Sequence, residues 1–140
     1  MPEDRLSAPL ELVLTVGLPY SGKSTYARAQ GLPIVNPDSI RLALHGQRYA
    51  APAEPFVWAI AQVMVEALFL AGHSRVIVDA THVTAKRREF WLDRYPDLRL
   101  VVLRTSPAEC IRRAKVASDD EIVPVIERMA KEWDLGGAWE

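Results

Sequence analysis

A glycine-rich segment near the start of the chain constrains its fold more than any other feature. Residues 17–24 read Gly-Leu-Pro-Tyr-Ser-Gly-Lys-Ser, which fits the pattern of Gly, four residues and Gly-Lys-Ser/Thr. Residues 10–16 are rich in branched apolar side chains and predict a strand, and residues 23–30 predict a helix. In this order, the N–H groups of the loop and the N-terminus of the helix face one point. The sequence therefore predicts an α/β fold whose first loop binds phosphate.

The individual residues of this loop suit the phosphates of a nucleotide. The glycines permit the sharp turn, Lys23 can reach the β- and γ-phosphates, and the Ser24 hydroxyl can bind Mg²⁺. We therefore predict ATP or GTP, together with Mg²⁺, as the ligand; a glycine-rich turn with an incidental lysine is the plainer alternative. The predicted nucleotide-binding residues are Gly17, Tyr20, Ser21, Gly22, Lys23, Ser24 and Thr25.

Composition is typical of one globular domain. The chain has 140 residues, of which 49% are apolar, and we predict a single domain over residues 1–140 with a loose lead-in at residues 1–9. The net charge of -1 gives no overall positive field that would attract nucleic acid, although a local basic groove remains an alternative. The single cysteine, Cys110, excludes an internal disulfide and suits a reducing compartment. No signal peptide is evident, and the apolar run 56–71 is short for a membrane span, so we predict a core helix, no membrane partner and a cytoplasmic protein.

The remainder of the chain alternates short apolar strands with helices. This alternation indicates a parallel sheet that is covered on both faces. Ligands of such sheets bind at the carboxyl ends of the strands, where Gly17, Asp38, Asp79 and Thr105 fall. Strands are predicted at 33–35, 75–79 and 98–104, and helices at 37–45, 56–71, 85–94, 107–117 and 123–133.

Two acidic residues at this edge are candidates for chemistry. Asp79 ends an apolar strand and can hold a Mg²⁺-bound water opposite Ser24. Asp38 can accept the proton of an attacking hydroxyl, and Arg41, three residues later on the same helix face, can bind a phosphate or carboxylate of the acceptor. Capping roles for the two aspartates and a plain surface pair of Asp38 with Arg41 are the alternatives.

Basic residues and one histidine complete the candidate set. Arg112 and Arg113 lie near the end of the helix predicted at 107–117, where small kinases carry a lid whose arginine stabilises the transferred phosphoryl group. Basic residues also favour helix C-termini for electrostatic reasons alone. Residues 86–88 splay around their helix, so one or two can face an acceptor. His82 could hydrogen-bond a substrate, but a solvated loop histidine is the preferred interpretation.

Three segments carry a family resemblance. They are residues 17–28, residues 36–41 and residues 76–82, the last followed by two arginines. Together they resemble the phage-type 5′-polynucleotide kinase domain and the small bacterial predicted kinases related to it, over about residues 10–133. The resemblance implies a three-layer P-loop NTPase fold of the kinase type, with a short parallel sheet, flanking helices and a small lid at about residues 112–122.

The resemblance also implies a reaction and roles for residues. It implies a phosphotransferase that moves the γ-phosphoryl group of a nucleoside triphosphate to a hydroxyl, with the 5′-OH of RNA or DNA as the leading acceptor. Asp38 would be the general base, and Arg41 would contact the acceptor's phosphate. The catalytic residues that follow are Asp38, Lys23, Arg41 and Arg113, and the metal-binding residues are Ser24 and Asp79.

The chain departs from the family's pattern at two points. His82 stands where the family usually has Asn, and residues 116–121 are acidic where the family's lid carries arginines. An acidic lid is expected to repel a polyanionic nucleic-acid strand, so a sugar or nucleoside remains an alternative acceptor. A nucleotide-binding switch or degenerate kinase without transfer activity is a second alternative, and a toxin-like kinase that acts on a nucleotide sugar is a third.

Overall fold

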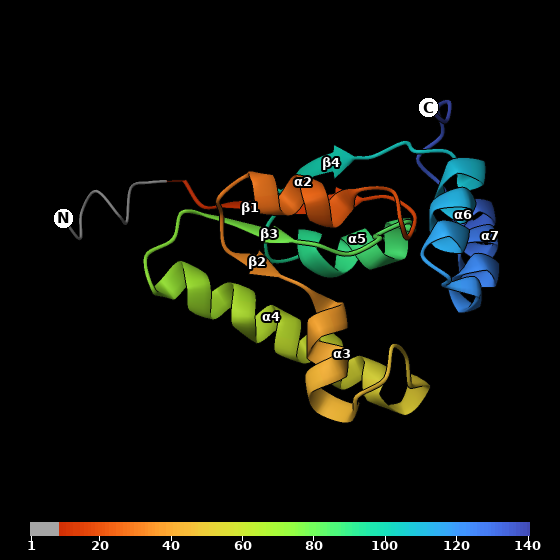
Figure 1. Ribbon diagram of the computed structural model, residues 1–140. Helices are drawn as coiled ribbons and strands as arrows, with labels where there is room; N and C mark the ends of the chain where they lie inside the picture. The colour runs from red at the N-terminus through yellow and green to blue at the C-terminus, as the bar shows by residue number, and fades with distance from the viewer. Residues whose placement is uncertain (1–8) are drawn as a thin grey trace.

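Four parallel strands form a single sheet at the centre of the computed structural model, which describes residues 9–140 (Figure 1). The strand order is β2-β3-β1-β4, and each neighbouring pair is parallel. The predicted lead-in lies outside the described residues except for Pro9. The strands are β1 (Glu11–Val16), β2 (Ile34–Val35), β3 (Arg75–Val78) and β4 (Arg99–Val102). The helices are α2 (Lys23–Ala29), α3 (Pro37–His45), α4 (Glu54–Leu70), α5 (Ala85–Leu92), α6 (Pro107–Val116) and α7 (Val123–Glu132), with short 3₁₀ turns η1 (Ala51–Ala53) and η2 (Asp120–Ile122).

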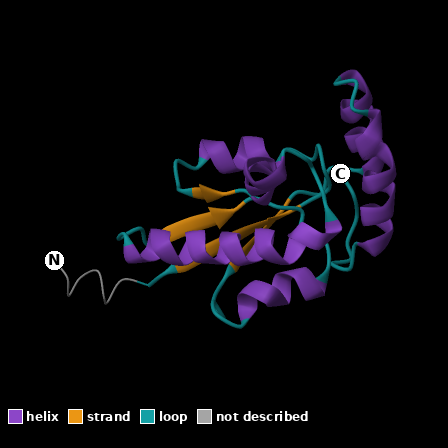
Figure 2. Cartoon of the chain, turned by 90° about the horizontal axis from the view of Figure 1, so that it is seen from below, coloured by secondary structure: helices purple, strands orange, loops and turns teal. Residues whose placement is uncertain are grey.

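The alternation of side chains along the strands divides the core between the two faces of the sheet. Leu12 and Leu14 of β1 point to one face, where they belong to a buried cluster with α4 and α5. Val13 and Ile77 point to the other face and meet Ala27 of α2. Figure 2 shows α4 running along its face of the sheet. This arrangement confirms the three-layer α/β fold of the P-loop kinase type.

Helix α4 and the turn before it are apolar and long enough to be compared with a membrane span. Residues Ala51–Leu70 meet the length and composition of such a span. Val57, Ala61 and Val65 of this helix are nevertheless fully buried against the sheet. We therefore interpret α4 as a core helix, as predicted, whose outer side carries exposed apolar residues such as Phe56.

Helices α6 and α7 pack against each other at the carboxyl ends of the strands, to one side of the sheet (Figure 1). Leu18 of the glycine-rich loop, Cys110 and Ala114 of α6, and Ile126 of α7 form a separate buried cluster. Cys110 is a free, buried cysteine in this cluster. This second cluster brings Ala114 of the predicted lid segment beside the glycine-rich loop.

Side-chain caps explain why three of the six helices, α3, α5 and α6, begin at their predicted starts. The side chains of Asn36, Thr84 and Ser106 each accept a hydrogen bond from backbone N–H groups in the first turn of the following helix. Helix α4 begins at Glu54, two residues before the predicted start, because proline is tolerated in the first turn and Pro55 does not interrupt the helix.

Candidate functional site

The glycine-rich loop between β1 and α2 leaves no room for side chains at its first glycine. A Cβ at Gly17 would lie 2.5 Å from Ser21 Oγ and 3.2 Å from the Leu103 carbonyl oxygen. Gly22, at the N-cap of α2, has a left-handed backbone with φ 101, which other residues rarely adopt. Thr105 Oγ1 fixes the loop by donating to the Ser21 carbonyl oxygen at 2.9 Å. Both glycines are therefore required for the observed turn.

Two polar side chains of the loop retain bonding capacity for a ligand. Lys23 is buried, and its Nζ donates to the Leu18 carbonyl oxygen at 2.8 Å. Burial lowers the pKa of Lys23, and the nearby Asp79 carboxylate opposes that shift. Ser21 Oγ is buried and has no hydrogen-bond partner within residues 9–140. A phosphate in the loop would offer oxygen acceptors to both groups, so the loop fits the predicted nucleotide.

The two predicted metal-binding residues are in contact. Ser24 Oγ donates to Asp79 Oδ2 at 2.7 Å. A hydroxyl and a carboxylate are hard oxygen ligands, which suit Mg²⁺, and Mg²⁺ sites use few protein ligands alongside water and substrate phosphates. The described part of the chain holds no cluster of three or more His, Cys, Asp or Glu side chains that could form a larger metal cage. The residues present therefore fit Mg²⁺ bound with a nucleotide.

Asn36 ties the start of α3 to Asp79. Its Oδ1 accepts from the N–H groups of Asp38 at 2.8 Å and Ser39 at 3.3 Å, while its Nδ2 donates to Asp79 Oδ2 at 3.3 Å. Among the common capping residues, only asparagine carries both an acceptor and an amide donor. Asn36 therefore links the first turn of α3, which contains Asp38, to Asp79. The sequence indicates Asn36 as a helix start but gives no sign of its bond to Asp79.

Asp38 and Arg41 form the predicted ion pair, with 2.7 Å between Asp38 Oδ1 and Arg41 Nη1. The Asp38 side chain is 77% exposed, whereas that of Arg41 is only 14% exposed. Arg41 also donates from Nε and Nη2 to both oxygens of Glu54, at 2.8 and 2.7 Å. These bonds from Arg41 lower the pKa of Glu54. Glu54 was not predicted, because it lies 13 residues away on another helix.

The three consecutive basic residues of α5 lie in three different environments, as their splay predicts. Lys86 is exposed. The Arg87 guanidinium lies 3.9 Å from the centroid of the Trp58 ring. Arg88 is buried, donating to the His82 carbonyl oxygen at 2.8 Å and to Asp134 Oδ1 at 2.5 Å. Arg88 therefore has a structural role. Arg87 and Arg41 face the same Trp58 ring, and the Arg41 guanidinium lies 6.0 Å from the centroid of that ring.

His82 is buried, so the interpretation of a solvated loop histidine is wrong. The side chain is 1% exposed and packs edge-on against Trp58, with 6.1 Å between the ring centroids. Its Nδ1 lies 2.7 Å from the Thr15 carbonyl oxygen. Because a carbonyl oxygen can only accept, Nδ1 carries the proton and Nε2 is the unprotonated nitrogen. Burial lowers the pKa of His82 to about 4.

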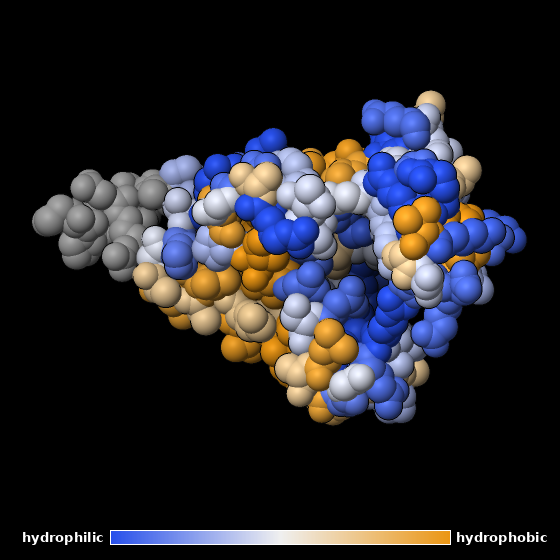
Figure 3. Space-filling view, in the orientation of Figure 1, coloured by the Kyte–Doolittle hydropathy of each residue, from blue (hydrophilic) through white to orange (hydrophobic). Residues whose placement is uncertain are grey.

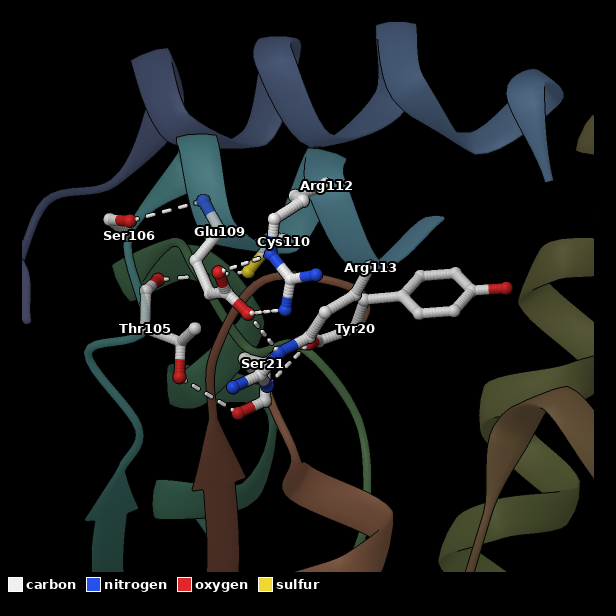
Figure 4. A network of polar contacts seen from close by, with 8 residues as sticks. All are labelled: Tyr20, Ser21, Thr105, Ser106, Glu109, Cys110, Arg112 and Arg113. Atoms are coloured by element: carbon white, nitrogen blue, oxygen red, sulfur yellow. Dashed lines mark hydrogen bonds and ion pairs between the residues drawn. The ribbon is translucent and has the colours of Figure 1, made fainter. Parts of the chain in front are cut away.

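Arg113 lies beside the glycine-rich loop, whereas its neighbour does not (Figure 4). Arg113 Nη1 donates to the Tyr20 carbonyl oxygen at 3.1 Å, and its Nε donates to Glu109 at 2.7 Å. Arg112 donates twice to Glu109, at 2.8 and 2.7 Å. The structure therefore brings one of the two candidate lid arginines, Arg113, to the predicted phosphate-binding loop.

One carboxylate of the acidic lid segment links three parts of the site. Asp119 accepts from Arg48 Nη1 at 2.8 Å and also from Arg48 Nη2, and it accepts from the Tyr20 hydroxyl at 2.8 Å. The bonds from Arg48 lower the pKa of Asp119. One acidic charge of the segment is thus paired, while Asp120 and Glu121 remain exposed.

Hydrophilic residues gather in the hollow between the α3 end of the molecule and the α6–α7 pair (Figure 3).

The chain is similar to a known protein family and to several solved structures. A family profile described as an AAA domain matches residues 12–131. No curated protein gives a significant match. A solved structure titled as the Pnkp1/Rnl/Hen1 complex contains a chain 28% identical to this one, with a TM-score of 0.67, over 74% of this chain and 39% of that chain.

Two further solved structures have the same fold. A chain in a structure of the Pnkp1/Rnl/Hen1 RNA repair complex is 21% identical, with a TM-score of 0.62, over 89% of this chain and 46% of that chain. A gluconokinase from Sinorhizobium meliloti 1021 is 20% identical, with a TM-score of 0.59, over 91% of this chain and 76% of that chain. The present chain spans less than half the length of the two chains from the repair complexes.

Proposed function

Because the chain belongs to the AAA domain family and has the P-loop kinase fold, we propose that it is a nucleoside-triphosphate-dependent kinase whose acceptor is the 5′-OH of a polynucleotide. The observation that carries the proposal is the contact between Ser24 and Asp79, to which Asn36 joins the helix of Asp38. A kinase needs a phosphate-binding loop, a metal-binding pair and a base at one point. Such an arrangement is supported here by the bond of Ser24 to Asp79 and by the bonds of Asn36 to Asp79 and to the backbone N–H of Asp38.

The donor side would bind ATP or GTP with Mg²⁺. The N–H groups of the loop and Lys23 would hold the phosphates, and Ser24 with Asp79 would hold the metal ion. Bound Mg²⁺ neutralises charge on the phosphates during transfer. Arg113 Nη1 donates to the Tyr20 carbonyl oxygen of the loop, which supports a role for its guanidinium in stabilising the transferred phosphoryl group.

The acceptor side would be formed by α3. Asp38 would accept the proton of the attacking hydroxyl as the hydroxyl oxygen bonds to the γ-phosphorus. The bond from the γ-phosphorus to the bridging oxygen breaks, and the nucleoside diphosphate leaves. Arg41 would bind an anionic group of the acceptor, and Glu54 would act as a positioning residue because it accepts from both Nε and Nη2 of the Arg41 guanidinium.

A polynucleotide acceptor is supported by the 28% identity to a chain whose structure is titled as a Pnkp1 complex. A small hydroxyl compound is the second candidate, favoured by the net charge of -1 and the exposed acids at Asp120 and Glu121. A nucleotide-binding switch without transfer remains the third. We also propose that the chain acts as one domain in the cytoplasm, supported by its single, buried Cys110.

The proposal is tested by phosphoryl transfer from radiolabelled ATP with Mg²⁺ to a 5′-OH oligonucleotide, a nucleoside and a sugar. We expect transfer to the oligonucleotide, reduced by a factor on the order of 100 or more in Asp38→Asn. Asp97→Asn, an exposed acid away from the site, serves as the matched control. Transfer to the sugar or nucleoside alone would select the second candidate, and nucleotide binding without any transfer would select the third.

A further inference from the structure

Helix α4 is apolar on its outer side as well as on the side that faces the sheet. Glu54 and Glu66 are the only charged residues within this helix. In Figure 2, α4 forms the outermost layer on its side of the sheet. Phe56 is 66% exposed, Val63 is 65% exposed and Leu70 is 77% exposed. A helix on the surface of a soluble protein normally carries polar residues on its outer side, so the apolar outer side of α4 indicates a missing partner.

The outward apolar residues form one straight stripe along α4. Phe56, Val63 and Leu70 are spaced seven residues apart, and two exposed alanines lie between them. Positions three, four or seven residues apart share one face of a helix. Apolar side chains also gather over the α4 side of the molecule, at the lower left of Figure 3. The outer stripe therefore consists of Phe56, Ala59, Val63, Ala67 and Leu70.

The order of side-chain sizes along the outer stripe is the same in both directions. Val63 lies at the centre, an alanine lies four residues to either side of it, and a large apolar residue lies seven residues to either side. Two copies of α4 that pack antiparallel about a two-fold axis at Val63 would therefore place Phe56 of each copy opposite Leu70 of the other. The alanines leave room for the two helix backbones to approach closely. The stripe is thus complementary to itself.

We propose that the outer stripe is the contact surface of a homodimer, in which two copies of this chain pack α4 against α4 in antiparallel orientation. Antiparallel helices bring opposite ends of their dipoles together. Glu66, beside the stripe, is paired with Arg94 of α5 at 3.1 Å, so its carboxylate would not enter the contact unpaired. Helix α4 itself contains no lysine or arginine, which a helix bound to an anionic membrane surface would present. This inference does not depend on the proposed function.

The size of the surface predicts a dimer of moderate affinity. Helix α4 has 17 residues and is therefore about 25 Å long. An apolar groove of about 330 Å³ between α3 and α4, lined in part by Ile40, Leu44 and Met64, adjoins the stripe and enlarges the apolar surface. Two such surfaces would bury roughly 1,000 to 1,200 Å² in total, near the lower limit for specific interfaces. We therefore expect association that depends on protein concentration rather than a permanent dimer.

Sedimentation equilibrium over a range of protein concentrations tests the association. We expect the average mass of the wild type to rise from that of the monomer toward that of the dimer, with a Kd on the order of 10 µM. Val63→Arg should raise this Kd by more than about 10-fold, because it places two like charges at the axis. Leu42→Arg changes a similarly exposed residue of α3 outside the stripe and should associate as the wild type does. Thermal unfolding by circular dichroism verifies that each variant is folded.

Cysteine cross-linking tests the antiparallel arrangement itself. A disulfide needs two Cα atoms within about 7 Å of each other, and an axis at Val63 brings the two copies of this residue together. With copper phenanthroline as the oxidant, we expect Val63→Cys to form a covalent dimer. Phe56→Cys and Leu70→Cys should form one efficiently only when the two variants are mixed. The wild type serves as the control, because its Cys110 is buried.

Each of three results would overturn the inference. The first is a wild type that stays monomeric at every concentration tested. The second is Val63→Arg that associates as strongly as the wild type, because the dimer would then use another surface. The third is efficient cross-linking of Phe56→Cys alone, which would indicate a parallel contact. If the monomeric wild type instead binds vesicles of phosphatidylcholine and phosphatidylserine, the outer stripe belongs to a membrane contact and the homodimer is ruled out.

Discussion

Ser24 and Asp79 lie in direct contact, with 2.7 Å between Ser24 Oγ and Asp79 Oδ2, although 55 residues separate them in the chain. One comes from the first turn of α2 and the other follows the end of β3. Their contact joins the phosphate-binding loop to the strand edge at which Asn36 and Asp38 also lie. The pair therefore provides the most direct test of the donor site.

Asp79→Asn should weaken binding of Mg²⁺-bound nucleotide by about 10- to 100-fold, because it removes the negative charge that would face the cation. Binding of the nucleotide in EDTA should change by less than about 3-fold, since the loop itself is intact. Calorimetric titrations with and without Mg²⁺ measure both values, with Asp97→Asn as the control. Equal affinity of the variant and the wild type for the Mg²⁺ complex would contradict the metal assignment.

Asn36→Asp should separate the capping role of this residue from its contact with Asp79. The aspartate retains the acceptor for the first turn of α3, so the free energy of unfolding should change by less than about 1 kcal/mol. It loses the amide donor and places a second carboxylate beside Asp79, so transfer activity should fall by more than about 10-fold. Ser106→Asp makes the same kind of cap substitution on α6 and should leave activity unchanged. Full activity in Asn36→Asp would show that its bond to Asp79 is dispensable.

His82 should make the protein less stable as the pH falls from 7 to 4. Its pKa lies at about 4 in the folded protein, below the ordinary 6.5, because Nε2 is buried without a partner within residues 9–140. The unfolded chain therefore binds the proton more readily. The contribution is complete above pH 6.5 and is lost as the pH falls through 4, a total of roughly 3 kcal/mol.

Urea unfolding at several pH values measures this effect, and His82→Asn should flatten the slope between pH 6.5 and 4. Asparagine suits the left-handed backbone here, where φ is 45. An unchanged slope in the variant would assign the acid sensitivity to other groups.

The ion pair of Arg48 with Asp119 should restrain the lid segment more than it stabilises the fold. Arg48 is 54% exposed, so Arg48→Met should cost less than about 1 kcal/mol of unfolding free energy. Amide hydrogen exchange across residues 116–122 should nevertheless become several-fold faster, and high salt should have a similar effect on the wild type. Arg128→Met, which breaks a surface pair on α7, is the control. Unchanged exchange in Arg48→Met would show that the Tyr20 hydroxyl holds Asp119 without it.

The sequence allowed most of the fold and part of the site to be predicted. Short apolar strands that alternate with helices predicted the parallel sheet, and the shared edge of such a sheet predicted that Ser24 and Asp79 would meet. The helix starts at capping residues could be predicted from the sequence because a cap joins residues only two or three positions apart.

Contacts between distant segments were not predictable in this way. Glu54 and Asp119 find their arginine partners 13 and 71 residues away, and no local pattern encodes such a distance. His82 was misassigned for the same reason, because the Trp58 ring that shelters it comes from α4. Where tertiary packing decides the environment of a side chain, residue type alone is a poor guide.

Leu18 belongs to the buried cluster of α6 and α7 rather than to the core between the sheet and its covering helices. The tip of the glycine-rich loop is thus anchored to the helical pair, while its two ends are anchored to β1 and α2. Any shift of that pair would be transmitted to the loop through this leucine. Because Lys23 Nζ donates to the carbonyl oxygen of the same leucine, the position of the helical pair and that of Lys23 would be coupled through one apolar residue.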